Sequence, residues 1–131
     1  MQSLVFNSVP TCADHSVRLV VWRGPQGDYA VGQSDADRPA GYRPVDLTGC
    51  ALALYVYKGT TLLATLRSDG TSPQVAIMPG TQGKIVVTFK AVNFTTAATG
   101  TYDHAMKCVF PGGRSDTLWV GPLNLIVVPT V

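Results

Sequence analysis

The sequence predicts an all-β protein in which two antiparallel sheets pack face to face. Short segments of alternating apolar and polar residues are separated by turn residues, and no segment keeps the 3.6-residue period of an amphipathic helix. All eight acidic residues are Asp, and the lack of Glu, a good helix former, favours strands and turns. With roughly seven to nine strands, an immunoglobulin-like β-sandwich fits this pattern best, and a jelly roll or small barrel is the alternative.

The chain is expected to form one domain over residues 1–131, because this length can bury a substantial core. Hydrophobic residues make up 46% and charged residues 14%, which argues against disorder and favours a surface partly covered by partners. The net charge of +2 and the scattered basic residues predict no nucleic-acid partner. No long apolar run and no secretory signal pattern is present. We therefore expect that the protein is synthesised in a cytoplasm and does not associate with a membrane.

The first firm strand is expected over His15–Trp22, with the odd-numbered residues 17, 19 and 21 facing the core. An earlier apolar run, Leu4–Phe6, could add an edge strand. Pro10 is expected to close that strand, since proline cannot donate a hydrogen bond to a ladder.

A long loop is predicted over residues 23–44, where Gly, Pro, Asp, Gln and Ser dominate and only Tyr29–Val31 could form a brief strand. Ordinary connections run to about 4–6 residues, so this segment is either a partner-binding loop or a simple insertion. Its candidate interface residues are of types favoured at protein interfaces: Tyr29, Arg38, Tyr42 and Arg43. Asp35 and Asp37 form a DxD pair, but the further oxygen ligands of a calcium loop are missing.

Cys50–Lys58 is expected to be a central strand, or a strand whose outer face meets another subunit, because both of its faces are fairly apolar. Tyr55 and Tyr57 point to the face opposite the core and are two further candidate interface residues. A turn at Lys58–Thr60 predicts that Thr61–Arg67 returns as the partner strand of a hairpin.

The C-terminal half predicts four more strands. Two short ones cover Gln74–Met78 and Gly83–Phe89, and residues 90–98 could hold one helical turn. Tyr102–Phe110 alternates strictly, with the even-numbered residues on the core face. The last strand, Thr117–Val128, is expected to kink at Gly121–Pro122, where a proline needs an edge position or a bulge.

No catalytic or cofactor motif is found, and we expect a protein without enzymatic activity, cofactor or metal. His104 and Asp103 are adjacent on one strand and therefore point to opposite faces. Cys108 lies about 13 Å along the same strand from His104, too far for a nucleophile–base pair. The other histidine, His15, has no second ligand at metal-binding spacing.

The three cysteines, Cys12, Cys50 and Cys108, are far apart in the sequence and form no CxxC pair. Cys50 and Cys108 are expected to be small buried hydrophobic residues. A contact between them across the two sheets is conceivable, but a cytoplasmic origin argues against a disulfide.

Four segments together resemble a known family: Val45–Gly49 leading into the central strand, Gly83–Val87, Gly100–Tyr102, and Thr117–Val127. They are similar to the immunoglobulin-like domain found at the N-terminus of tailed-phage baseplate upper proteins and in small phage tail or fibre-attachment proteins. Gly100 and Tyr102 also resemble a tyrosine corner, in which the ring closes the sandwich end and its hydroxyl bonds back to the backbone. Because the chain stops at Val131, the resemblance implies a stand-alone adaptor or decoration module.

The resemblance implies a non-enzymatic structural protein of a tailed-phage virion, in the tail, baseplate or fibre attachment, whose partners are other virion proteins. A homo-oligomer is compatible with it. One alternative is a capsid decoration protein on the phage head. A second is a carbohydrate-binding sandwich that would bind a host glycan on aromatic platforms: Tyr29, Tyr42, Tyr55, Tyr57 or Trp119.

Overall fold

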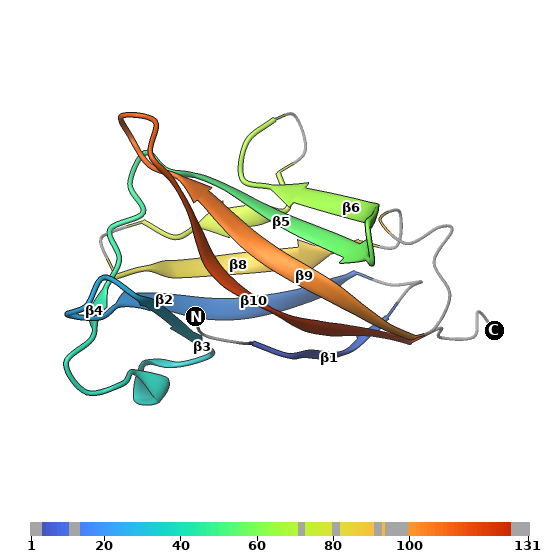
Figure 1. Ribbon diagram of the computed structural model, residues 1–131, viewed down its shortest axis with the longest axis horizontal. Coiled ribbons are helices and arrows are strands. Elements are labelled where there is room, and N and C mark those ends of the chain that lie inside the picture. The colour runs from blue at the N-terminus through green and yellow to red at the C-terminus, as the bar shows by residue number, and fades with distance from the viewer. Residues whose placement is uncertain are drawn as a thin grey trace.

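The computed structural model describes residues 4–10, 14–70, 73–79, 82–90, 93 and 100–126, and they form two β-sheets packed face to face (Figure 1). One sheet runs in the order β1 (Phe6–Pro10), β10 (Ser115–Ile126), β9 (Gly100–Val109), β5 (Ala51–Lys58), β6 (Thr61–Arg67). The other runs β3 (Tyr29–Gly32), β2 (His15–Arg23), β8 (Lys84–Phe89), β7 (Val75–Ile77). A two-residue strand, β4 (Arg43–Pro44), pairs with the end of β2.

This strand order confirms the predicted immunoglobulin-like sandwich. Strands β2, β8 and β7 share one sheet, while β5, β6, β9 and β10 share the other, which is the immunoglobulin partition of strands. All of these neighbours pair antiparallel, and β1 adds to β10 in parallel. The segment between residues 23 and 44, which carries β3 and β4, is inserted between β2 and the central strand β5.

The core lies between the sheets and follows the predicted alternation. Leu19 and Val21 are buried in it and Val17 packs at its edge, while Leu52, Leu54 and Val56 fill it from β5. On β9 the even-numbered residues from Tyr102 to Cys108 are all buried. The period-2 pattern therefore identified the core faces of β2, β5 and β9 correctly.

Pro122 lies in a strand with neighbours on both sides, because β10 runs between β9 and β1. The register shift in its pairing with β9 falls between Thr117 and Trp119, earlier than the expected kink at Gly121–Pro122. Gly121 itself is packed against the N-terminal segment: a Cβ there would lie 1.9 Å from the Leu4 carbonyl oxygen. The glycine is needed because the backbone just before β1 passes close to it.

The 23–44 segment is folded against the outer face of its own sheet, where it covers Trp22. Trp22 is 1% exposed and forms a small second core with Val20, Ala30 and the ring of Tyr42. A Cβ on Gly32 would lie 2.6 Å from the Asp37 Cβ and 2.9 Å from the Trp22 ring, so this cover fits closely. The brief strand expected at Tyr29–Val31 is confirmed as β3.

A 3-10 turn, η1 (Asp35–Asp37), forms part of this cover and accounts for both residues of the DxD pair. The Asp37 carboxylate accepts hydrogen bonds from the backbone N–H groups of Gln33 and Ser34, at 3.0 and 3.2 Å. Asp35 forms an ion pair with Lys84 at 3.4 Å. The two carboxylates thus fix the turn and tie it to β8.

Candidate protein-interaction surfaces

The six candidate interface residues lie in two separate regions. Tyr29, Tyr42, Arg38 and Arg43 belong to the inserted segment, at the end of the sandwich where β4 and the β9–β10 turn also lie (Figure 1). Tyr55 and Tyr57 lie on the outer face of β5, in the other sheet. Arg38 is an exposed residue directly after η1.

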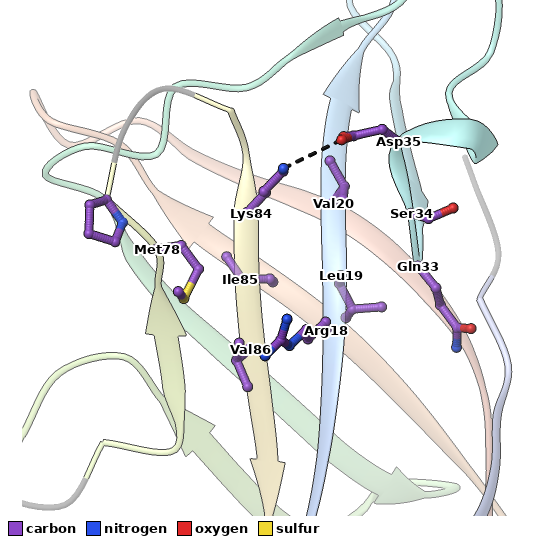
Figure 2. Close-up of a pocket in the computed structure, with 11 residues that line it drawn as sticks. Arg18, Leu19, Val20, Gln33, Ser34, Asp35, Met78, Lys84, Ile85 and Val86 are labelled. Carbon is purple, nitrogen blue, oxygen red and sulfur yellow. Dashed lines mark ion pairs between the residues drawn. The ribbon is translucent and has the colours of Figure 1, made fainter.

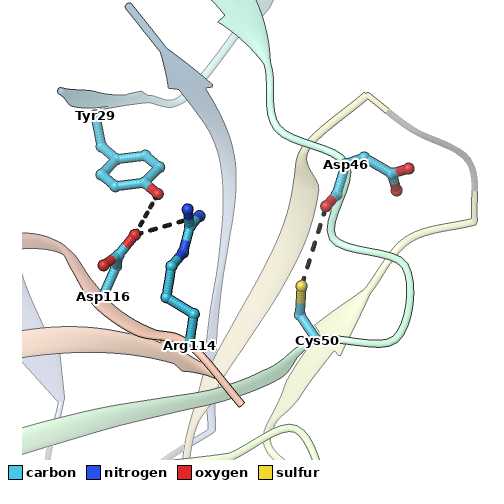
Figure 3. Close-up of polar contacts among 5 residues, drawn as sticks. All are labelled: Tyr29, Asp46, Cys50, Arg114 and Asp116. Carbon is cyan, nitrogen blue, oxygen red and sulfur yellow. Dashed lines mark hydrogen bonds and ion pairs between the residues drawn. The ribbon is translucent and has the colours of Figure 1, made fainter. Parts of the chain in front are cut away.

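Tyr29 ties the two sheets together. Its hydroxyl donates a hydrogen bond of 2.7 Å to the Asp116 carboxylate on β10, which also pairs with Arg114 at 3.5 Å (Figure 3). The Arg23 guanidinium lies over its ring, 5.5 Å from the centroid. Burial and the hydrogen bond to Asp116 raise the pKa of Tyr29. This half-buried ring is already bound within the molecule.

Tyr42 has a similar structural role on the outer side of the same sheet. Its ring packs on the small core around Trp22, and its hydroxyl donates to the Asp28 carboxylate. That hydrogen bond is the main cause of a raised pKa for Tyr42. Both tyrosines of the inserted segment therefore hold the segment to the sandwich.

An arginine hollow opens beside Tyr29, between the two sheets. It has a volume of about 450 Å³ and is formed by the end of β2, by β4 with the residues that follow it, and by the β9–β10 turn. The guanidinium groups of three arginines line it. Only Arg43 was predicted as an interface residue from the sequence, because the three arginines are distant from one another along the chain. Its lining residues include Arg23, Arg43, Arg114, Pro44, Val45, Asp46 and Phe110.

The tyrosine face, defined as Ala53, Tyr55, Tyr57, Ala105 and Lys107, covers the centre of the other sheet. Ala105 lies directly opposite Tyr55 in the β5–β9 ladder, and Lys107 lies over the Tyr55 ring at 5.7 Å. A shallow hollow of about 290 Å³ is bounded by the two tyrosines, Ala105 and Lys107. Among the described residues, neither tyrosine hydroxyl has a hydrogen-bond partner.

A further groove, of about 470 Å³, lies on the outer face of the sheet that contains β2 and β8, between η1 and the β7–β8 hairpin (Figure 2). Lys84 reaches across its upper part to Asp35, and Arg18, Val86 and Met78 form much of its floor and wall. The sequence did not indicate this groove, because η1 and β8 come together only through the fold.

Two expectations about buried residues are wrong. Trp119 is 0% exposed and so is no sugar-stacking platform; its indole N–H donates a 2.9 Å hydrogen bond to Nε2 of His104. Cys50 and Cys108 do not meet across the sheets: Cys108 is on β9 and Cys50 directly precedes its neighbour β5 in the same sheet. Both thiols are free, and burial raises the pKa of Cys108 to about 12. Cys12 lies outside the described residues.

His104 is fully buried in the core, as expected from the alternation of β9. Burial lowers its pKa to about 4, and the nearby backbone of Gly121 and Pro122 acts weakly in the opposite direction. Since Nε2 accepts the Trp119 hydrogen bond, the ring is neutral with its proton on Nδ1, and Nδ1 has no hydrogen bond of normal geometry to any described residue. A neutral, enclosed imidazole of this kind is a core residue.

Tyr102 is the predicted corner tyrosine. It is buried near the start of β9, two residues after Gly100, and the Lys58 ammonium lies 5.2 Å from its ring centroid. The upstream backbone that its hydroxyl would reach, residues 94–99, lies outside the described residues, as does most of the helical turn expected at 90–98.

In the part of the chain that the structure describes, no three His, Cys or Asp side chains are grouped so that they could hold a metal ion. No helix within the described ranges is long and apolar enough to cross a membrane.

Comparison with known proteins adds no assignment. No protein-family model matches the chain, and no curated protein matches it at a significant level.

Proposed function

We propose that this protein is a non-enzymatic structural component of a tailed-phage virion, in the tail, baseplate or fibre attachment, and that it acts by protein–protein contacts. The resemblance of four sequence segments to phage immunoglobulin-like domains motivates the virion context. The contact surface we propose is the tyrosine face, which carries the docking argument independently of that resemblance.

The observation that supports docking is a pair of half-exposed tyrosines on the outer face of β5, whose hydroxyls have no hydrogen-bond partner among the described residues. Tyrosine supplies a large apolar ring and a polar group at low entropic cost, and it is enriched at interface hot spots. Ala53 and Ala105 lie beside the rings but are each only 8% exposed, so the tyrosine rings and Lys107 would supply most of the surface that a partner meets. Lys107 over the Tyr55 ring is the charge at its centre.

The two alternatives predict different contexts for the same surface. A capsid decoration protein would use a comparable face on the head of the phage. A carbohydrate-binding module would need aromatic rings with carboxylates and amides nearby, and the loss of Trp119 as a platform leaves it less support. Neither alternative has an observation that favours it over the first.

The direct test of the virion context is the composition of purified particles. We expect the chain to be present in a fixed number of copies per particle, measured by quantitative mass spectrometry. Its confinement to the infected-cell lysate, with none in purified particles, would refute the proposal. Particles separated into heads and tails would distinguish a tail component from a capsid decoration protein.

The docking surface is tested with the double substitution Tyr55→Ser, Tyr57→Ser. We expect loss of incorporation with an unchanged cooperative unfolding transition, because both rings stand outside the core. The matched control is Met78→Ser, which removes a 43% exposed apolar side chain from the opposite sheet. Equal incorporation of the double variant and the control would exclude the tyrosine face as the docking surface.

A further inference from the structure

We propose that the arginine hollow binds the carboxylate groups of an acidic polypeptide segment. This inference rests on the proposed function in taking the partner to be a protein. It concerns a second surface, at the end of the sandwich, whereas the tyrosine face lies on the outer side of one sheet.

The first argument is an unbalanced pair of charges. Arg23 on β2 lies directly opposite Arg43 on β4, and both line the hollow. Like charges directly opposite each other destabilise an antiparallel pair. Among the described residues, neither guanidinium has a carboxylate within ion-pair distance. The juxtaposition of these two charges does not stabilise the β2–β4 pair, whereas an external anion would be attracted by both groups.

The second argument is that two of the three guanidinium groups are already held in place. Arg114 lies over the Phe110 ring at 4.6 Å and is anchored by Asp116 at 3.5 Å, while Arg23 lies over the Tyr29 ring at 5.5 Å. Such contacts reduce the entropy that a side chain loses on binding. A fixed guanidinium fork matches the two oxygens of a carboxylate.

The shape and lining of the hollow favour a carboxylate on an amino-acid side chain over a free phosphate ion. Pro44, Val45 and Phe110 give apolar wall beside the cations, which suits the methylene stem of an Asp or Glu side chain. Asp46 stands at the rim, and hydrogen bonds from Thr48 lower its pKa, so it remains ionised. Its charge disfavours a dianion more than a single carboxylate.

The test is an NMR titration of the labelled full chain with a capped peptide of alternating Asp and Glu. The Nε–Hε signals of Arg23, Arg43 and Arg114 should shift, and added salt should weaken binding. Arg43→Gln should weaken binding about tenfold, because it removes a charge-assisted contact. Arg38→Gln is the matched control, since it removes the same charge from an exposed site of the same segment and should leave binding unchanged.

Four results would overturn the inference. The first is equally strong binding of an uncharged peptide in which Asn and Gln replace Asp and Glu. The second is that Arg38→Gln weakens binding as much as Arg43→Gln does. The third is tighter binding of inorganic phosphate than of the peptide to the three arginines, which would make this a site for a free oxyanion. The fourth is a lower melting temperature of the Arg43→Gln variant, since relief of like-charge repulsion should leave the melting temperature equal or slightly higher.

Failure of this inference is distinguishable from failure of the proposed function. The peptide titration reports on the arginine hollow alone, and incorporation of the Tyr55/Tyr57 double variant reports on the tyrosine face.

Discussion

The tyrosines of the inserted segment and those of β5 have the same side chain but different surroundings. Tyr29 donates to Asp116 on the other sheet, and Tyr42 donates to Asp28 of its own segment while its ring packs against Trp22, so both hold the segment in place. Tyr55 and Tyr57 lie on the outer face of β5, a strand that is already stabilised by its core-facing residues. A residue type favoured at interfaces is therefore structural where a loop must be fastened, and available for a partner where the strand is already held by its ladder.

The largest expected effect concerns the floor of the inserted segment. Trp22→Ala should destabilise the protein by about 3–5 kcal/mol, because it leaves a cavity under the cover that contains Gly32 and Tyr42. Chemical denaturation measures this loss. A change no larger than that of an exposed residue would show that the segment is a loose loop and would remove the structural half of the comparison.

A second prediction concerns the core beneath the tyrosine face, where His104 is held neutral. Its pKa is about 4 in the folded protein against 6.5 for an ordinary histidine, so the unfolded chain binds the proton more readily between these pH values. The contribution of neutral His104 to the free energy of unfolding is fully present above pH 6.5. It falls by about 3 kcal/mol as the pH drops towards 4. NMR should show neutral His104 ring signals down to about pH 4; titration near 6.5 would contradict the assignment.

Gly32→Ala tests how closely the segment covers Trp22. The added methyl group would meet Asp37 and the Trp22 ring at distances that require a shift, so we expect a loss of about 1–3 kcal/mol. Gly41→Ala is a poor control because its φ is +82°. Ala40→Ser, at an exposed site of the same segment, should change stability by less than about 0.5 kcal/mol. Equal effects of the two substitutions would argue against close packing.

The smallest effects compare the two kinds of tyrosine directly. Tyr29→Phe removes the hydrogen bond to Asp116 and should cost about 1.5 kcal/mol. Tyr55→Phe removes a hydroxyl without a described partner and should cost less than about 0.5 kcal/mol. Thermal denaturation of the matched pair gives both values, and a larger loss for Tyr55→Phe would reverse the roles that we assign.

Local periodicity was sufficient to predict the long strands and the core faces of β2, β5 and β9. The alternation from Tyr102 to Cys108 depends only on the two-residue repeat of a strand, and burial follows it. The immunoglobulin-like arrangement followed from the number and spacing of such segments. These features are local, so a single sequence contains them.

The contacts that form the candidate sites are non-local, and the sequence did not indicate them. Arg23 and Arg114 line one hollow only because the two sheets pack, and Cys50 reaches Cys108 sideways within a sheet because β5 pairs with β9. Trp119 is buried because its side chain faces the core between the two sheets, where it bonds to His104. Residue type alone suggested an exposed platform there, whereas the packing of the two sheets decides its burial.

The most direct test of the central claim is oxidative footprinting of tyrosines in the free protein and in purified particles. We predict that Tyr55 and Tyr57 are labelled in the free chain and protected in the particle. Tyr42, which is fastened within the molecule, should be labelled to the same extent in both. Equal labelling of Tyr55 and Tyr57 in the two states would contradict docking through the tyrosine face.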